Sequence, residues 1–189
     1  MHATVHQFRV PLGAGAPEPD LGPGALGACT LAQVVGLTGA VVTFWPDAAT
    51  ASEAAARRPA GTTWLDTGVY RVAEIQPASA EAVFAQVTWF DGPRGADQSA
   101  AELRAGRDRV WPAVRALDGV GTTYVLLAED RALVVVSFAA SIETIEATHV
   151  AIASTELLPG EDPALLPGPD RVDLHRVLHA ALPEPAGAR

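Results

Sequence analysis

Two histidines stand at positions from which they could do chemistry. His149 recurs with Ile145 and Ile152 at helical spacing, so its side chain is expected to face a sheet. There it is either a hydrogen-bonded core residue, or a general base or haem ligand. His175 shares one face of an expected strand with Asp173, and an aspartate can orient a histidine base. Asp173 and His175 are about 7 Å apart at the backbone, a spacing that also suits simple edge packing or solvent exposure. Both histidines are candidate catalytic residues.

The strand expected over residues 82–90 carries the candidate ligand-binding residues. Alternation places Gln86 and Thr88 on one face and Trp89 on the other. Polar side chains on an otherwise apolar strand are typical of a barrel lumen that holds a ligand, whereas Trp89 is also an ordinary core residue. Only one face can point inward, so the two sets are alternatives. Tyr124 on a later hairpin and one of the two histidines complete either pocket.

Composition excludes several other kinds of site. The formal net charge of −9 argues against a nucleic-acid partner, and the absence of lysine excludes Schiff-base chemistry. The single cysteine, Cys29, cannot form an internal disulfide, and no cysteine and histidine cluster has zinc spacing. Gly13 and Gly15 lack the rest of a dinucleotide fingerprint, and no nucleophile elbow is present. We therefore expect neither a metal nor a cofactor.

No membrane partner is expected. No apolar run approaches the length of about 20 residues that spans a bilayer, and the first residues lack the basic segment and apolar core of a signal peptide. With 49% apolar residues the chain can bury a substantial core. We expect a folded cytoplasmic protein whose partner is a small hydrophobic molecule.

An internal repeat organises the elements that must position these residues. Residues 122–138 read as two apolar runs broken by Glu129, Asp130 and Arg131, which is the pattern of a β-hairpin. Residues 28–44 match that stretch without a gap and end in Ala-Val-Val-Thr-Phe where the later copy ends in Val-Val-Val-Ser-Phe. The chain is therefore interpreted as two divergent copies of one unit.

Each copy is expected to contain a strand, a connector, the hairpin, a helix and a last strand. In the second copy, Ser99 and Glu102 form a capping box that starts a helix, which Pro112 should bend. Ser141 caps the next helix, and Asp47 caps the helix of the first copy. The remaining expected elements are strands over 4–10, 62–65, 69–75 and 171–178, a helix over 48–58, and loops over 11–27, 76–80 and 155–170.

The second copy has the β-α-β-β-α-β order of a ferredoxin-like unit. The connector over 11–27 is shorter than its counterpart over 91–121 by about one average helix, so the first copy is expected to lack its first helix. We predict an α+β fold with a degenerate half over 1–76, a complete half over 82–182 and a flexible tail over 183–189. A ligand pocket is expected in the lumen of the second half, because that half keeps both helices.

Three motifs of the second half carry a family resemblance. They are WFDGP at 89–93, ELRAGR at 102–107 and TELLPG at 155–160. Together with the repeated unit, they resemble the dimeric α/β-barrel superfamily, which contains the antibiotic-biosynthesis and haem-degrading monooxygenases. The resemblance implies two ferredoxin-like units that pack sheet against sheet into a barrel, usually from two chains and here from one, as a pseudo-dimer. Haem-degrading members use an asparagine with a tryptophan and a helix histidine, and this chain has no asparagine.

Two functions follow from the resemblance. One is a cofactor-independent monooxygenase, in which the cavity desolvates an aromatic or polyketide-like substrate and a base forms its carbanion for attack by oxygen. The alternative is a non-catalytic small-molecule-binding or structural barrel, because a shared fold does not fix an activity. The size of the cavity separates them, since a pocket below about 300 Å³ is too small for a typical ligand.

Overall fold

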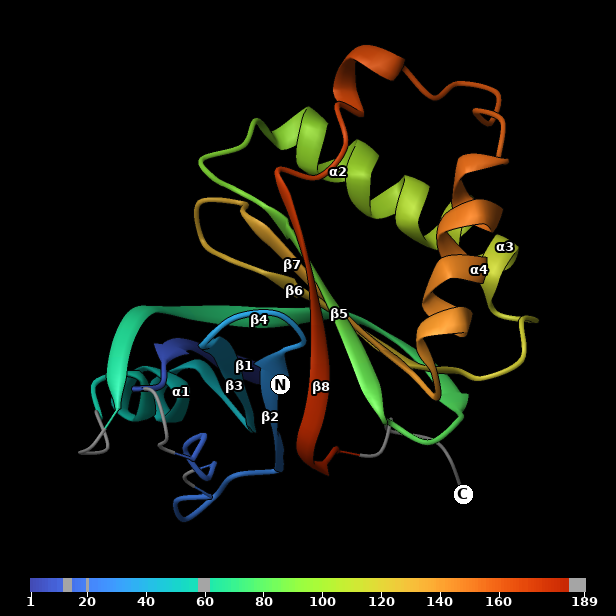
Figure 1. Cartoon of the computed structure of the whole chain (residues 1–189). Coiled ribbons are helices and arrows are strands. Elements are labelled where there is room, and N and C mark those ends of the chain that lie inside the picture. Colours follow the sequence, from blue (N-terminus) through green and yellow to red (C-terminus); the bar gives the residue numbers. More distant parts are fainter. Residues whose placement is uncertain (12–14, 20, 58–61, 184–189) are drawn as a thin grey trace.

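The computed structural model describes residues 1–11, 15–19, 21–57 and 62–183, and within them eight strands close one antiparallel barrel (Figure 1). Around the barrel the strand order is β1-β3-β2-β8-β5-β7-β6-β4. The strands are β1 (His2–Arg9), β2 (Gly27–Gln33), β3 (Thr38–Trp45), β4 (Thr63–Ser79), β5 (Phe84–Phe90), β6 (Val120–Leu127), β7 (Leu133–Ala139) and β8 (Arg171–Ala181). The helical segments are α1 (Ala48–Ala55), α2 (Ala96–Ala105), a π-helical turn (Gly106–Val110), α3 (Trp111–Val114), α4 (Ile142–Ala153) and a 3-10 turn (Pro163–Leu165).

Both halves of the chain have the same strand order. It is β4-β1-β3-β2 in the first half and β8-β5-β7-β6 in the second. The halves meet where β2 pairs with β8 and where β4 pairs with β6, so the barrel closes within one chain. The predicted α+β barrel is confirmed, whereas a tandem duplication stays a prediction. The predicted tail lies, beyond Pro183, outside the described residues.

The helices lie outside the barrel, and most of them cover its second half. Figure 1 shows α2, α3 and α4 beside β5, β6 and β7, with α1 against the first half. Asp47 accepts from the backbone N–H of Thr50 at 2.9 Å and Ser141 from that of Thr144 at 3.2 Å, so both predicted caps are confirmed. The described residues between β1 and β2 form no helix. None of the described helices is long and apolar enough to cross a membrane.

The helix predicted from Ser99 begins earlier and is interrupted. Because α2 already begins at Ala96, Ser99 lies on its buried face. Glu102 pairs with Arg94 at 2.7 Å and does not cap the helix, so the capping-box prediction is wrong. After α2 the chain widens into the π turn just before Pro112, which has no N–H to donate to the preceding turn.

One long strand, β4, replaces the two strands and the loop predicted over 62–80. It is continuous because it pairs first with β1 and then with β6, and so belongs to both halves of the barrel. A register shift opposite Gln7 marks a bulge beside the predicted turn. A second shift lies around Pro77, whose missing N–H the ladder must bypass.

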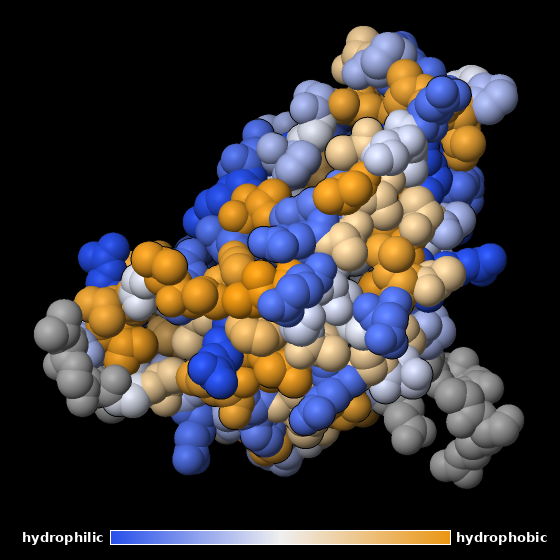
Figure 2. All heavy atoms as spheres, turned by 45° about the vertical axis from the view of Figure 1, so that its right-hand side comes forward, coloured by the Kyte–Doolittle hydropathy of each residue, from blue (hydrophilic) through white to orange (hydrophobic). Residues whose placement is uncertain are grey.

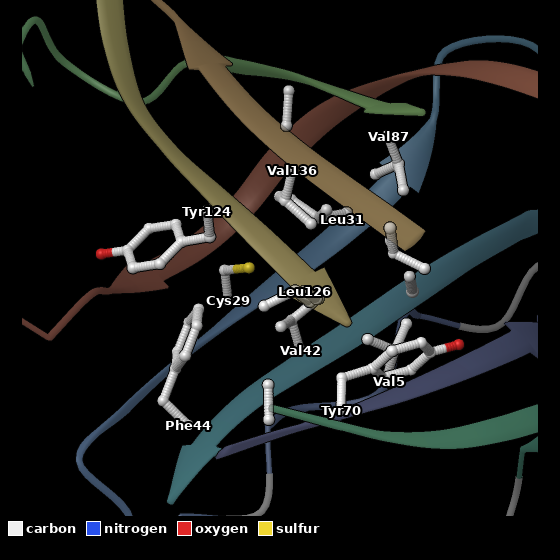
Figure 3. Packing of buried hydrophobic residues seen from close by; sticks show 14 of the residues in the cluster. Val5, Cys29, Leu31, Val42, Phe44, Tyr70, Val87, Tyr124, Leu126 and Val136 are labelled. Carbon is white, nitrogen blue, oxygen red and sulfur yellow. The ribbon is translucent and has the colours of Figure 1, made fainter. Parts of the chain in front are cut away.

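Apolar side chains fill the interior of the barrel (Figure 3). Val87, Leu126 and Val136 are fully buried there. The ring of Phe44 lies 4.6 Å from that of Tyr124, centroid to centroid. The interior of an eight-stranded barrel is just wide enough for side chains to fill. The predicted ligand pocket in the lumen is therefore wrong, because the lumen is the hydrophobic core.

Candidate functional site

A cavity of about 510 Å³ lies outside the barrel, between the sheet of the second half and its helices. The outward faces of β4, β5, β6 and β7 form its floor, and α2, the π turn and α4 form its walls. This volume is in the usual range for a ligand pocket. Figure 2, which brings the side of α3 and α4 forward, shows hydrophobic and hydrophilic residues interspersed on this face. Val172, which is 45% exposed, lies both on the surface and in the cavity lining.

The lining of the cavity is mainly apolar. Six of its larger members are Phe90, Leu103, Val110, Trp111, Val135 and Ile152. The π turn contributes part of this wall, and such turns are frequent at functional sites. An apolar ligand surface therefore has contacts on the floor and on the helices.

One row of polar side chains crosses this floor. Gln76 of β4 is opposite Thr123 of β6. Thr123 is opposite Ser137 of β7, which is in turn opposite Gln86 of β5. All four line the cavity, and adjacent strands are about 4.8 Å apart, so the row is about 14 Å long. A ligand on this floor meets hydrogen-bonding groups along one line.

A hydrogen-bonded chain of three side chains lies at the β5 end of the row. Nε2 of His149, on α4, contacts Oε1 of Gln86, and Nε2 of Gln86 donates to Oγ1 of Thr88 at 3.1 Å. With the amide oxygen toward the ring, His149 Nε2 carries the proton and Nδ1 is left as an acceptor. His149 is exposed at the edge of the cavity and is not packed in the core. A base at this position stays accessible to a ligand.

Ion pairs fix the α2 side of the cavity. Arg94 and Glu102 are both buried, and their Nη1 and Oε1 atoms lie 2.7 Å apart. Arg94 also contacts Asp170 just before β8, and Nε of Arg109 lies 2.9 Å from Oε2 of Glu161. Burial raises the pKa of Glu102, although the Arg94 guanidinium opposes that shift. These pairs tie α2 and the π turn to the segment that leads into β8.

The structure separates the two alternative faces of β5. Gln86 and Thr88 line the cavity together with His149. Trp89 and Tyr124 belong instead to the buried core of the barrel. The Trp89 indole donates to a carboxylate of β8 at 2.9 Å, and the Tyr124 hydroxyl donates to a backbone carbonyl after β8 at 3.0 Å. Burial raises the pKa of Tyr124 to about 12, so its hydroxyl stays protonated.

Comparison with known proteins identifies the fold. No family model and no curated protein matches the sequence. A protein of Fusobacterium nucleatum, named provisionally as a monooxygenase, matches with a TM-score of 0.65 and 10% identity over 95% of this chain and 93% of its own. An anthrone oxidase-like protein matches with a TM-score of 0.62 and 13% identity over 95% and 92%. A ferredoxin-fold protein of Listeria monocytogenes, related to antibiotic biosynthesis monooxygenases, matches with a TM-score of 0.53 and 10% identity. The match covers 92% of this chain and 93% of the Listeria protein.

The chain has the dimeric α/β-barrel fold. At these identities the likeness establishes the fold alone, and the chemistry of the cavity must be argued from its own residues. Within the described residues, no three His, Cys, Asp or Glu side chains are grouped closely enough to hold a metal ion.

His175 is buried and does not line the cavity. It is 2% exposed, and its Nδ1 has no hydrogen-bond partner among the described residues. Burial lowers its pKa, although the charge of Asp173 opposes the shift. The predicted pairing with Asp173 is thus an interaction within one strand, and His175 does not line the cavity that the polar row borders.

The free energy of unfolding should fall as the pH drops below about 6.5, the usual pKa of histidine. The unfolded chain protonates His175 at a higher pH than the folded chain, so stability is complete above that value and is lost toward the lowered folded pKa. For one proton the slope approaches about 1.4 kcal/mol per pH unit. Urea unfolding at a series of pH values measures it. His175→Gln should flatten the slope, whereas the control His179→Gln, at an exposed position, should not. Equal slopes in the unchanged protein and both variants contradict the prediction.

Two residues of the polar row escaped the sequence reasoning, although a signal was present. In a hairpin centred on Asp130, residues at equal distances before and after Asp130 lie opposite each other. Thr123 and Ser137 are such a pair. Both are polar positions on strands whose other outward residues are mainly apolar. A single threonine or serine on an apolar hairpin strand is also ordinary in a β-hairpin, so the pattern alone does not mark either residue as functional.

Proposed function

We propose that this chain binds a small aromatic or polyketide-like molecule in the cavity and oxidises it with molecular oxygen, without a resident cofactor. The cavity carries the proposal: about 510 Å³ of mainly apolar space beside an oriented histidine, His149. The oxidase and monooxygenase names of similar structures support the reaction class. The charge of −9 and the absence of lysine leave no indication of a nucleic-acid partner.

His149 serves as the base in the proposed reaction. Gln86 holds Nε2 as a donor, so Nδ1 accepts a proton from an acidic methylene group of the substrate. Thr88 accepts a hydrogen bond from Gln86, and its own O–H is therefore available to donate to the oxygen of the delocalised anion.

Oxygen completes the proposed reaction. The carbanion transfers electrons to the oxygen molecule, a C–O bond forms, and protonation gives a hydroperoxide. Loss of water then leaves a carbonyl group. In sum, one methylene group and one oxygen molecule give one carbonyl group and one water, so the substrate itself supplies the electrons.

Anthrone is a suitable first probe, with oxygen uptake measured above its spontaneous oxidation. His149→Ala should lower kcat/KM about a hundredfold, the usual contribution of a general base. Gln86→Leu should lower it less, about tenfold, because the base remains but its orientation is lost. His179→Ala is the matched control, since His179 is exposed on β8 and lies outside the cavity lining.

Two results contradict parts of this proposal. Equal turnover in His149→Ala and in the unchanged protein removes His149 as the base. Saturable binding of anthrone without oxygen uptake favours the non-catalytic binding protein, which uses the same cavity but not its histidine.

A further inference from the structure

Two hydroxyl groups in the cavity floor have no hydrogen-bond partner among the residues that the structure describes. The side chains of Thr123 and Ser137 line the cavity and are half-buried. Neither hydroxyl makes a hydrogen bond within the described part of the chain. Both differ from the few side-chain atoms that are fully buried without a partner, because both remain open to the cavity. By contrast, Gln76 donates to Glu74 at 3.1 Å and Gln86 bonds Thr88 and His149. The free capacity of the row is therefore at its two central members.

The position of these hydroxyls indicates a role in binding. The other outward positions of β7 are Leu133, Val135 and Ala139, which suit a surface covered by helices. Once an apolar ligand excludes water from the floor, a hydroxyl left without a hydrogen bond costs about 1–3 kcal/mol. No hydrogen bond among the described residues uses either hydroxyl, so both are available to a ligand.

Their spacing selects a chemical pattern. Thr123 and Ser137 are direct cross-strand neighbours, so their side chains are separated by about 5 Å. Two oxygens bound meta to each other on an aromatic ring are also about 5 Å apart, whereas ortho oxygens are much closer. We propose that Thr123 and Ser137 recognise a meta-dioxygenated aromatic edge, which makes the ligand a planar ring system with two such oxygens. This inference rests on the proposed binding of an aromatic molecule, but not on its oxidation.

The pair also sets the orientation of the ligand. Ser137 is opposite Gln86, and Gln86 contacts His149, so the base lies about one strand spacing beyond the recognised oxygens. When the hydroxyl pair holds the dioxygenated ring, the adjoining ring of the ligand therefore lies next to His149. The acidic methylene group is expected in that adjoining ring.

Two isomeric naphthalene diols test the proposal by titration calorimetry, one with meta and one with ortho hydroxyls on the same ring. They have the same composition and apolar area, so they differ in oxygen spacing. The meta isomer should bind about fivefold or more tightly. Thr123→Val and Ser137→Ala should each reduce that preference by about threefold to tenfold, the range for one hydrogen bond. Thr43→Val is the control, because Thr43 occupies the position of Ser137 in the internal repeat and lies outside this cavity.

The outcomes separate this inference from the proposed function. Equal affinities for the two isomers, unchanged in both variants, overturn the hydroxyl-pair assignment and leave the cavity as a binding site. Failure of both isomers to bind overturns the cavity and the assignment together. Meta preference that is lost in the variants supports the assignment, even if anthrone assays show no oxygen uptake and the proposed reaction is rejected.

Discussion

Replacing Arg94 by methionine is expected to lower the free energy of unfolding by about 3–5 kcal/mol, the usual cost of leaving one partner of a buried ion pair uncompensated. Glu102 loses the Nη1 atom that lies 2.7 Å from its Oε1, at a site where its side chain is 4% exposed. Asp170 loses a second contact, and the ring of Phe90 loses a cation 5.4 Å from its centroid. The substitution thus disconnects β5, α2 and the segment before β8 at one point.

Urea unfolding of matched variants measures this effect. Arg107→Met is the control, because the Arg107 side chain is 55% exposed and ion pairs at the surface contribute little to stability. The double variant Arg94→Met with Glu102→Gln should recover part of the loss, since no buried charge remains unpaired. Equal losses in Arg94→Met and Arg107→Met would show that the buried pair contributes no stability.

The loss in Arg94→Met should also shrink in mild acid. Burial raises the pKa of Glu102 in the intact protein, and removal of the guanidinium raises it further because the charged form loses its partner. A carboxyl whose folded pKa is raised destabilises the fold above that pKa and ceases to do so as the pH falls through it. The difference between variant and unchanged protein should therefore be smaller at about pH 5 than at about pH 7.

The hairpins and helix caps could be predicted because their signals are local, whereas the closed barrel was implied by the family resemblance. The hairpins at 28–44 and 122–138 each combine two apolar runs with a polar turn, and both form as expected. Asp47 and Ser141 cap helices because each can reach a free backbone N–H of the first turn. Ser99 has the same local pattern, but the Arg94 guanidinium competes for the Glu102 carboxylate, a contact that depends on tertiary structure.

The location of the cavity could not be predicted, because both faces of β5 are covered. Alternation identifies the residues that share a face, but it does not tell a filled interior from an open one. The face with Ala85 and Val87 meets the other strands of the barrel, and small apolar side chains there fill the lumen. The face with Gln86 and Thr88 meets the helices, which stand off and leave the cavity.

Replacing Leu126 by alanine is expected to lower the free energy of unfolding by about 2–5 kcal/mol, the usual range for truncating a buried leucine. Leu126 is fully buried in the interior, where Val42 and Val136 belong to the same cluster (Figure 3). Side chains from several strands surround it and cannot all shift to fill the space it leaves. Urea unfolding measures the loss, which should be independent of any ligand in the outer cavity.

Adjacent valines of β7 provide the matched comparison for the two faces of the sheet. Val136 is fully buried in the barrel, whereas Val135 is half-buried on the cavity floor. Val136→Ala should cost about 1.5–3 kcal/mol, from lost burial and from the new void. Val135→Ala should cost less, because its side chain already borders empty space and has fewer contacts to lose. Equal losses would mean that the helices pack on Val135 as tightly as the barrel packs on Val136, and a floor packed that tightly has no room for a ligand.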